Sequence, residues 1–293
     1  MKIIIHAFIN ENSLPYFKYM LQNYCDLARD ADLLEFHAYC LSKNLELQLS
    51  KIHRVTEIIP VYKQPQYFVK QTLKDQIKSI ASYLGIHFSL AGSNGHAAGL
   101  NAAFKRTGKA IDIIADVDTL MLVQGWEQYV VEWLKIYGVV ATSYENIGGI
   151  SSGVSRQQTY KNKPSLTWLA LSPRYDFTRL NADPDKRSNI VINTDELSEL
   201  YQLPLNYELV RDVGWKMPVY LQQNNIPFLV FQQIKPSAQN SVLKTGLDYH
   251  EEYHIDDMVF LAHQRGSHQH PFRGNDISTR FYNAYEKFVA DIS

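Results

Sequence analysis

Two carboxylates one residue apart, Asp116 and Asp118, close an apolar run that begins at Ala110. A continuous apolar run of this length predicts a parallel-sheet strand covered on both faces. Ligands of open α/β sheets bind beyond the carboxyl ends of the strands, where both aspartates would lie. Buried carboxylates are costly unless a cation or hydrogen-bond donors compensate them, and Mg²⁺ and Mn²⁺ prefer such oxygen ligands. The run therefore predicts a divalent-metal site, with helix capping or pairing to Lys or Arg as the alternative.

The chain contains two further Asp-x-Asp triplets, which serve as internal controls. Asp30-Ala-Asp32 closes an amphipathic helical pattern, and Asp183-Pro-Asp185 lies in a loop rich in Pro, Lys and Arg. Neither follows an apolar run, so we interpret both as solvated surface charge.

Length and composition favour an α/β chain that folds without covalent staples. Its 293 residues suffice for one large domain or two small ones, and its formal net charge of −1 gives no global reason to expect nucleic acid as a partner. Two cysteines without a Cys-x-x-Cys pattern indicate a reducing compartment, and no apolar stretch approaches the length of a membrane span. We therefore expect a cytoplasmic protein.

The elements that would position Asp116 and Asp118 follow an alternating pattern. Residues 2–9, 35–41 and 55–61 are predicted strands separated by helices, an order that implies right-handed crossovers and a parallel sheet. Ser13 is the predicted N-cap of the first helix, with Pro15 in its first turn. Later expected elements are helices at 70–84, 126–136 and 218–224, strands at 138–143 and 227–232, and a helix from Asp276. Residues 146–188 and 233–257 are expected to be loops.

A turn rich in Gly and Asn precedes an Ala-rich helix, just before the apolar run that ends in Asp116 and Asp118. Gly92, Gly95 and Gly99 would let backbone or helix approach a ligand closely, and a helix N-terminus favours phosphate. The spacing is neither the dinucleotide fingerprint nor a Walker loop, and close helix packing is the alternative explanation for these glycines.

Taken in order, these features resemble glycosyltransferases of the GT-A fold, most nearly the family 2 type. The resemblance is carried by a first strand at 3–10, Asn94-Gly95, Gly99 with Asn101, Gly108, and the Asp-x-Asp that closes an apolar strand. It implies a single α/β (Rossmann-like) domain with a mixed, mostly parallel central sheet flanked by helices. Residues 1–145 would form the nucleotide-sugar-binding half, and residues 146–293 the acceptor-binding and C-terminal half.

The same resemblance implies metal-dependent transfer of a hexose or pentose from a nucleotide sugar, with a UDP-sugar expected, to a hydroxyl acceptor. Mn²⁺ or Mg²⁺ would be held by Asp118 and by the late histidine His263, with Asp116 contacting ribose or the metal through water. The residues implied in donor binding are Ala7, Phe8, Asn10, Asn94, Gly95, Gly99, Asn101, Asp116, Arg265, Ser267 and His268. For His263 the alternatives are a polar surface loop that binds nothing, or zinc bound together with His268 and His270.

Inverting members of this family use a carboxylate base near the acceptor, and Asp212 in Arg-Asp-Val-Gly-Trp is the best match. Arg211 stands where a second acidic residue is often found, so inversion is in question and a retaining enzyme would need no such base. Asp212 could instead be a helix N-cap, and Trp215 could stack on an acceptor sugar or lie in the core.

Two other functions compete with this interpretation. A sugar-phosphate nucleotidyltransferase would carry a Gly-rich, basic signature after the first strand, and residues 9–13 contain none. A noncatalytic domain that binds a nucleotide or carbohydrate is the other. The acceptor stays open between a glycan, a lipid-linked sugar, a protein side chain and a modified base in DNA. A basic surface would favour a phosphate-rich acceptor, and the candidates for it are Lys161, Lys163, Arg174, Arg179, Lys186 and Arg187.

Overall fold

The structure is a computed structural model of the whole chain. It describes residues 1–63, 93–143, 162–182, 190–201, 205–206, 208–209, 213–214, 216–234, 240–247, 250–264, 272–274 and 276–292. The helix expected at 70–84 lies outside these residues.

The first sixty residues form three parallel strands joined by helices. β1 (Ile3–Ile9) leads through α1 (Leu14–Leu27) to β2 (Leu34–Cys40), and α2 (Lys43–Leu49) leads to β3 (Val55–Pro60). β2 pairs in parallel with both β1 and β3, as the alternating pattern predicts. Short 3-10 turns complete this part: η1 (Glu11–Ser13), η2 (Ala31–Leu33) and η3 (Val61–Lys63).

The middle of the chain supplies the strand that carries the aspartates. After α4 (Ser93–Phe104), β4 (Ile111–Ala115) pairs in parallel with β1 and is buried along its whole length. A tight turn then gives β5 (Thr119–Met121), and α5 (Trp126–Ile136) precedes β6 (Val139–Thr142). The buried apolar strand expected before Asp116 is thus present.

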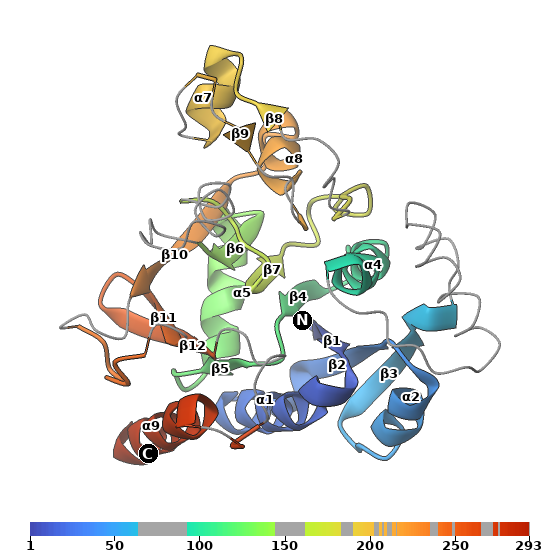
Figure 1. The fold of residues 1–293 in the computed structure, drawn as a ribbon, viewed down its shortest axis with the longest axis vertical. Coiled ribbons are helices and arrows are strands. Elements are labelled where there is room, and N and C mark those ends of the chain that lie inside the picture. Colours follow the sequence, from blue (N-terminus) through green and yellow to red (C-terminus); the bar gives the residue numbers. More distant parts are fainter. Residues whose placement is uncertain are drawn as a thin grey trace.

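The last part of the chain returns to the same sheet. β7 (Trp168–Leu171), β10 (Phe228–Ile234), β11 (His250–Ile255) and β12 (Met258–Gln264) are followed by the C-terminal helix α9 (Asp276–Ile292). A small two-stranded sheet with its helices completes the described chain: β8 (Ile190–Val191), α7 (Asp195–Tyr201), β9 (Glu208–Leu209) and α8 (Met217–Gln223). In Figure 1, α7, β8 and β9 stand apart from the large sheet, beyond α8.

Among the described residues the main sheet has ten strands, in the order β3-β2-β1-β4-β7-β6-β10-β11-β12-β5. It is mixed, as predicted: parallel pairing joins β3, β2, β1 and β4, and also β6 with β10. Antiparallel pairing joins β7 to both of its neighbours and runs from β10 through β11 and β12 to β5, so it is more extensive than expected. The sheet places β5, from the middle of the chain, next to β12, which lies far later in the sequence.

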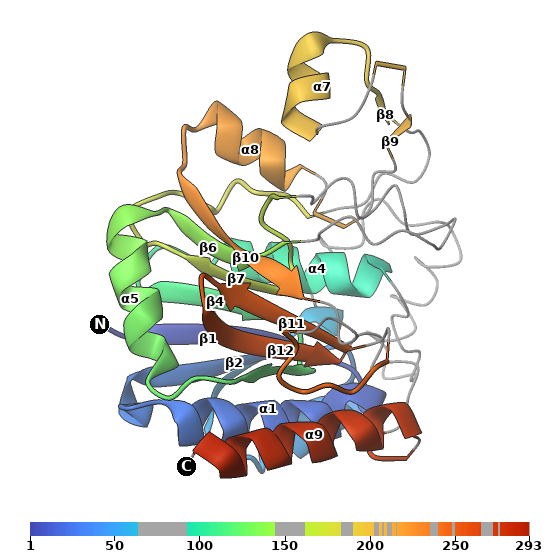
Figure 2. The same cartoon turned by 90° about the vertical axis from the view of Figure 1, so that its left-hand side faces the viewer.

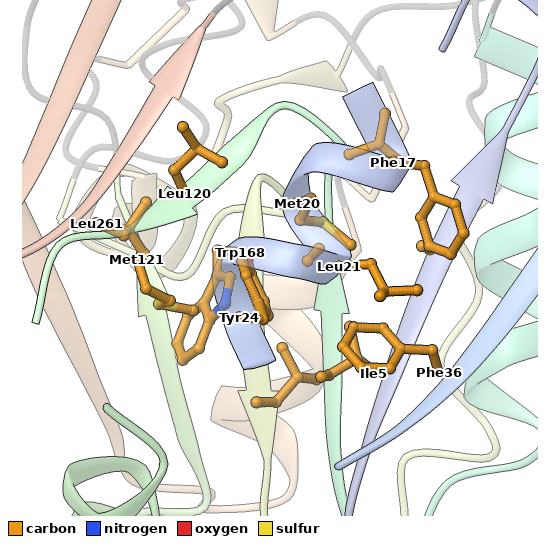
Figure 3. Packing of buried hydrophobic residues seen from close by; sticks show 14 of the residues in the cluster. Ile5, Phe17, Met20, Leu21, Tyr24, Phe36, Leu120, Met121, Trp168 and Leu261 are labelled. Atoms are coloured by element: carbon orange, nitrogen blue, oxygen red, sulfur yellow. The ribbon is translucent and has the colours of Figure 1, made fainter. Parts of the chain in front are cut away.

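Helices cover both faces of the sheet. α1, α2, α5 and α9 share one hydrophobic cluster with the strands, whereas α4 and α8 belong to the cluster on the other face. α1 and α9 lie side by side in both views (Figures 1 and 2). Figure 3 shows part of the first cluster, with Phe17, Met20 and Leu21 of α1 beside Ile5 and Phe36 of the parallel strands. This core fixes the strands whose ends form the site.

The structure departs from the sequence-based expectations in four places. Residues 168–171 and 250–255, expected in loops, are strands, and residues 119–121 form an unexpected short strand. Ser13 makes no side-chain cap to α1; its hydroxyl accepts a hydrogen bond from the backbone of Asn10, whose side chain accepts from the Ser13 amide. This capping box stabilises η1 instead. No helix among the described residues is long and apolar enough to cross a membrane.

Candidate metal centre and donor site

The Asp-x-Asp sequence forms a tight turn between β4 and β5. The Thr119 amide donates to the Asp116 carbonyl at 3.2 Å, and the Thr119 hydroxyl donates to the same carbonyl at 2.7 Å. The Tyr24 hydroxyl of α1 lies 2.8 Å from the Thr119 hydroxyl. Two backbone hydrogen bonds connect this turn to neighbouring segments: the Asp116 amide donates to the Thr167 carbonyl, and the Gln264 amide donates to the Asp118 carbonyl. The two aspartates are therefore held on a rigid turn.

His263 reaches this turn from the neighbouring strand. β12 pairs antiparallel with β5, and His263 lies opposite Thr119 in the register. Its Nε2 lies 3.4 Å from Asp118 Oδ1, and ligand atoms of Asp116, Asp118 and His263 all lie within 4.8 Å of one another. Asp118 and His263 are each 5% exposed. The alternative interpretation, in which His263 lies in a polar surface loop, is therefore wrong, because this residue is buried in β12.

Two buried side chains, Glu251 and Tyr253, form a chain of hydrogen bonds that ends at His263 Nδ1. Glu251 of β11 lies opposite His263 in the register, and its Oε2 accepts hydrogen bonds from His263 Nδ1 at 3.0 Å and from the Tyr253 hydroxyl at 2.8 Å. Burial lowers the pKa of His263, but the charges and hydrogen bonds of Asp118 and Glu251 outweigh it and raise that pKa to about 10. Without a metal, a proton on His263 thus compensates the two carboxylates.

Asp116 is the more open of the two aspartates, with 31% of its side chain exposed. Desolvation raises its pKa to about 7, the charge of Asp118 adds to the rise, and His263 opposes it. His96 of α4 lies on its other side, with Nε2 3.8 Å from Asp116 Oδ1. A strongly raised carboxyl pKa marks a position where a cation would be favourable.

The residues fit a divalent cation. Ligands at right angles on an ion with bonds of about 2.1 Å are about 3 Å apart, which is close to the 3.4 Å between His263 Nε2 and Asp118 Oδ1. Two carboxylates and one imidazole form a mixed oxygen and nitrogen set suited to Mn²⁺ as well as Mg²⁺. The three candidate ligands Asp116, Asp118 and His263 include no cysteine thiolate.

Predicted donor residues of β1 lie next to the aspartates but differ in access. Ala7 is fully buried, so only its backbone could contact a ligand. The Phe8 ring is partly buried against Tyr39 and His96, with ring centroids 5.2 and 5.4 Å away. A Cβ added at Gly99 would collide with the Phe8 ring, so this glycine allows α4 to pack closely on β1.

The predicted asparagines occupy structural positions as well. Asn10 Oδ1 accepts from the Ser13 amide at 2.9 Å, and Asn101 Oδ1 accepts from the Ala182 amide at 2.7 Å. Asn94, Gly95 and His96 lie in the first turn of α4, and Gly99 follows in the second. Donor contacts for Asn10, Asn94, Gly95, Gly99 and Asn101 remain predictions.

Five predicted site residues lie outside the described part of the chain. These are Asp212, Trp215, Arg265, Ser267 and His268.

Sequence reasoning overlooked Glu251 and His96. Glu251 lies in the sequence Glu-Glu-Tyr-His, and only the register of β11 against β12 shows which of these residues lies opposite His263. His96 follows Asn94-Gly95 directly, so its place at the start of the Ala-rich helix was an available signal.

Comparison with known proteins gives structural neighbours only. No protein-family model matches the chain, and no curated protein matches its sequence. The chain is similar to mannosyltransferase PcManGT from Pyrobaculum calidifontis, solved with GDP-Man and Mn²⁺, at 12% identity and a TM-score of 0.35. That match covers 73% of this chain and 55% of PcManGT.

Two further neighbours align along almost the whole chain. S. aureus TarS 1–349 matches at 11% identity and a TM-score of 0.45, covering 99% of this chain and 73% of TarS 1–349. Galactosyltransferase LgtC, solved with donor and acceptor sugar analogs, matches at 12% identity and a TM-score of 0.44, covering 98% of this chain and 96% of LgtC. Two of these three neighbours are named as a mannosyltransferase and a galactosyltransferase, and all three match with TM-scores below 0.5. A likeness at 11–12% identity is one of chain path alone.

Proposed function

We propose that this chain is a metal-dependent glycosyltransferase that uses a nucleotide-sugar donor, with a UDP-sugar expected, and a hydroxyl acceptor. The observation that carries the proposal is the convergence of Asp116, Asp118 and His263 at the carboxyl end of a buried parallel strand. The order of motifs that resembles the family 2 type leads to the same chemistry from the sequence.

Asp118 and His263 would hold the cation directly, and Asp116 would contact it through water or bind the donor ribose. When bound, Mn²⁺ or Mg²⁺ would neutralise the charge that develops on the leaving nucleoside diphosphate. α4 begins beside Asp116, because His96 of its first turns lies within 3.8 Å of that carboxylate. The backbone amides of Asn94 and Gly95 at this N-terminus are suited to a phosphate group.

The remaining roles extend this proposal along the chain. Phe8 and its neighbours on β1 would contact the donor, while Arg265, Ser267 and His268, which follow β12 directly, would reach its diphosphate. Asp212 would act as the general base of an inverting reaction, with Trp215 against the acceptor sugar. In this scheme residues 1–145 bind the donor and residues 146–293 bind the acceptor.

The test is nucleotide release from UDP-, GDP-, CMP- and dTDP-sugars with and without Mn²⁺, because slow donor hydrolysis needs no acceptor. We compare the wild type with D118N and with the matched control D32N, which alters the exposed Asp30-Ala-Asp32 triplet, where the Asp32 side chain is 95% exposed. Support requires metal-dependent release from at least one donor that D118N abolishes and D32N retains. Absence of release together with absence of metal-dependent donor binding would overturn the proposal.

A further inference from the structure

Glu251 is a buried acid whose position has no explanation in packing alone. It is 2% exposed and lies on β11, in the interior of the antiparallel segment of the sheet. Placing a carboxylate there is costly unless its hydrogen bonds serve a neighbour or a charge compensates it.

Its partners define the orientation of His263. Directly opposed residues of an antiparallel pair have neighbouring side chains, and Glu251 Oε2 lies 3.0 Å from His263 Nδ1. The Tyr253 hydroxyl, two residues along the same strand, donates to the same oxygen at 2.8 Å. Because a carboxylate oxygen accepts, the hydrogen of this bond belongs to His263 Nδ1, which leaves Nε2 directed at Asp118.

We propose that Glu251, held by Tyr253, is the positioning residue that makes His263 a metal ligand. It fixes the imidazole in the tautomer protonated on Nδ1 and orients Nε2 toward the cation, as outer carboxylates do for metal-bound histidines. This inference rests on the proposed metal site and adds to it a residue that never touches the metal or the donor.

The neighbouring residue provides a matched control. Glu252 is also 2% exposed, but its carboxylate accepts from the Ser241 hydroxyl, the Val242 and Leu243 amides and His254 Nε2. Adjacent residues of a strand face opposite sides, so Glu252 has a similar burial and a different set of partners. A change at Glu252 tests the cost of altering a buried acid without altering the support of His263.

The experiment measures the affinity for Mn²⁺ alone, by electron paramagnetic resonance of the free ion, for wild type, E251Q, E251L and E252Q. Loss of an outer-shell partner lowers metal affinity by about 10- to 100-fold. We expect E251L to fall in this range, E251Q to lose less because its amide oxygen still accepts, and E252Q to stay within about twofold of wild type. Nitrogen-15 spectra of histidine-labelled, Mg²⁺-loaded protein should show His263 protonated on Nδ1 in wild type and E252Q but not in E251L.

The outcomes separate the two proposals. If wild type binds Mn²⁺ and E251L binds it equally well with an unchanged tautomer, the positioning role is wrong while the metal site stands. If E251L and E252Q lose affinity to the same extent, the effect is a general cost of altering a buried acid, and the positioning role is also wrong. If wild type does not bind Mn²⁺, this inference fails, while the proposed function is decided separately by metal-dependent nucleotide release and donor binding.

Discussion

Acid should weaken the fold through one buried histidine, His250, which joins β11 to α9. His250 is 1% exposed, and its Nε2 donates to the Ile277 carbonyl at 3.0 Å. The centroid of its ring lies 4.9 Å from that of the Phe281 ring. Its Nδ1 has no hydrogen-bond partner among the described residues. Burial lowers the pKa of His250 to about 4; the bond to Ile277 opposes this shift, whereas the charges of His263 and Arg280 add to it.

The sign of the effect follows from proton linkage. The unfolded chain binds a proton at His250 near pH 6.5, about 2.5 pH units above the folded chain, so stability is complete above pH 6.5 and falls as the pH drops toward 4. For these two pKa values the free energy of unfolding decreases by about 2 kcal/mol between pH 7 and pH 5. The substitution H250Q retains a donor for the Ile277 carbonyl but cannot titrate.

Urea unfolding of wild type and H250Q, followed by tryptophan fluorescence at both pH values, isolates this contribution. The wild type should lose about 2 kcal/mol more than H250Q between the two conditions. The control F281L removes packing against the same ring and should lower stability equally at both pH values. Equal pH dependence in wild type and H250Q would refute the reasoning.

Two further substitutions test the packing around the site. G99A should destabilise the fold by about 1–3 kcal/mol in urea unfolding, because the added methyl group collides with the Phe8 ring; a change below about 0.5 kcal/mol would mean that α4 is free to move away. N23A should lower the free energy of unfolding by about 2 kcal/mol in the same measurement, because the Asn23 side chain accepts from the Met121 amide at 2.8 Å and donates to the Met121 carbonyl at 3.2 Å. An unchanged stability would show that β5 does not need these two hydrogen bonds.

The part of the site that sequence could predict is the part set by local pattern. The apolar run before Asp116 is a buried strand, and the aspartates follow it at the carboxyl end, as expected from the rule for parallel sheets. The exposed Asp30-Ala-Asp32 triplet also behaves as predicted, because no strand precedes it. The final helix begins at Asp276, where the periodic apolar pattern starts.

The contacts that pairing creates could not be predicted in the same way. β11 alternates poorly in sequence, since His250, Glu251, Glu252 and His254 are all buried, so a pattern of hydrophobicity does not identify this partner of β12. Their register is what brings Glu251 to His263. The same holds for Asp112 inside the apolar metal strand, which is 1% exposed and whose carboxylate lies 2.9 Å from His6 Nε2. A single sequence carries no signal for such pairs, because their stability depends on which strands become neighbours.

The most direct test of the central claim is calorimetric titration of nucleoside diphosphates, UDP first and then GDP, CDP and dTDP, with and without Mn²⁺. We expect at least one nucleotide to bind at least about tenfold more tightly with Mn²⁺, and D118N to remove this gain while D32N keeps it. Binding that is independent of Mn²⁺ for every nucleotide, or a gain that survives D118N, would contradict the claim that Asp118 holds a cation for a nucleotide-sugar donor.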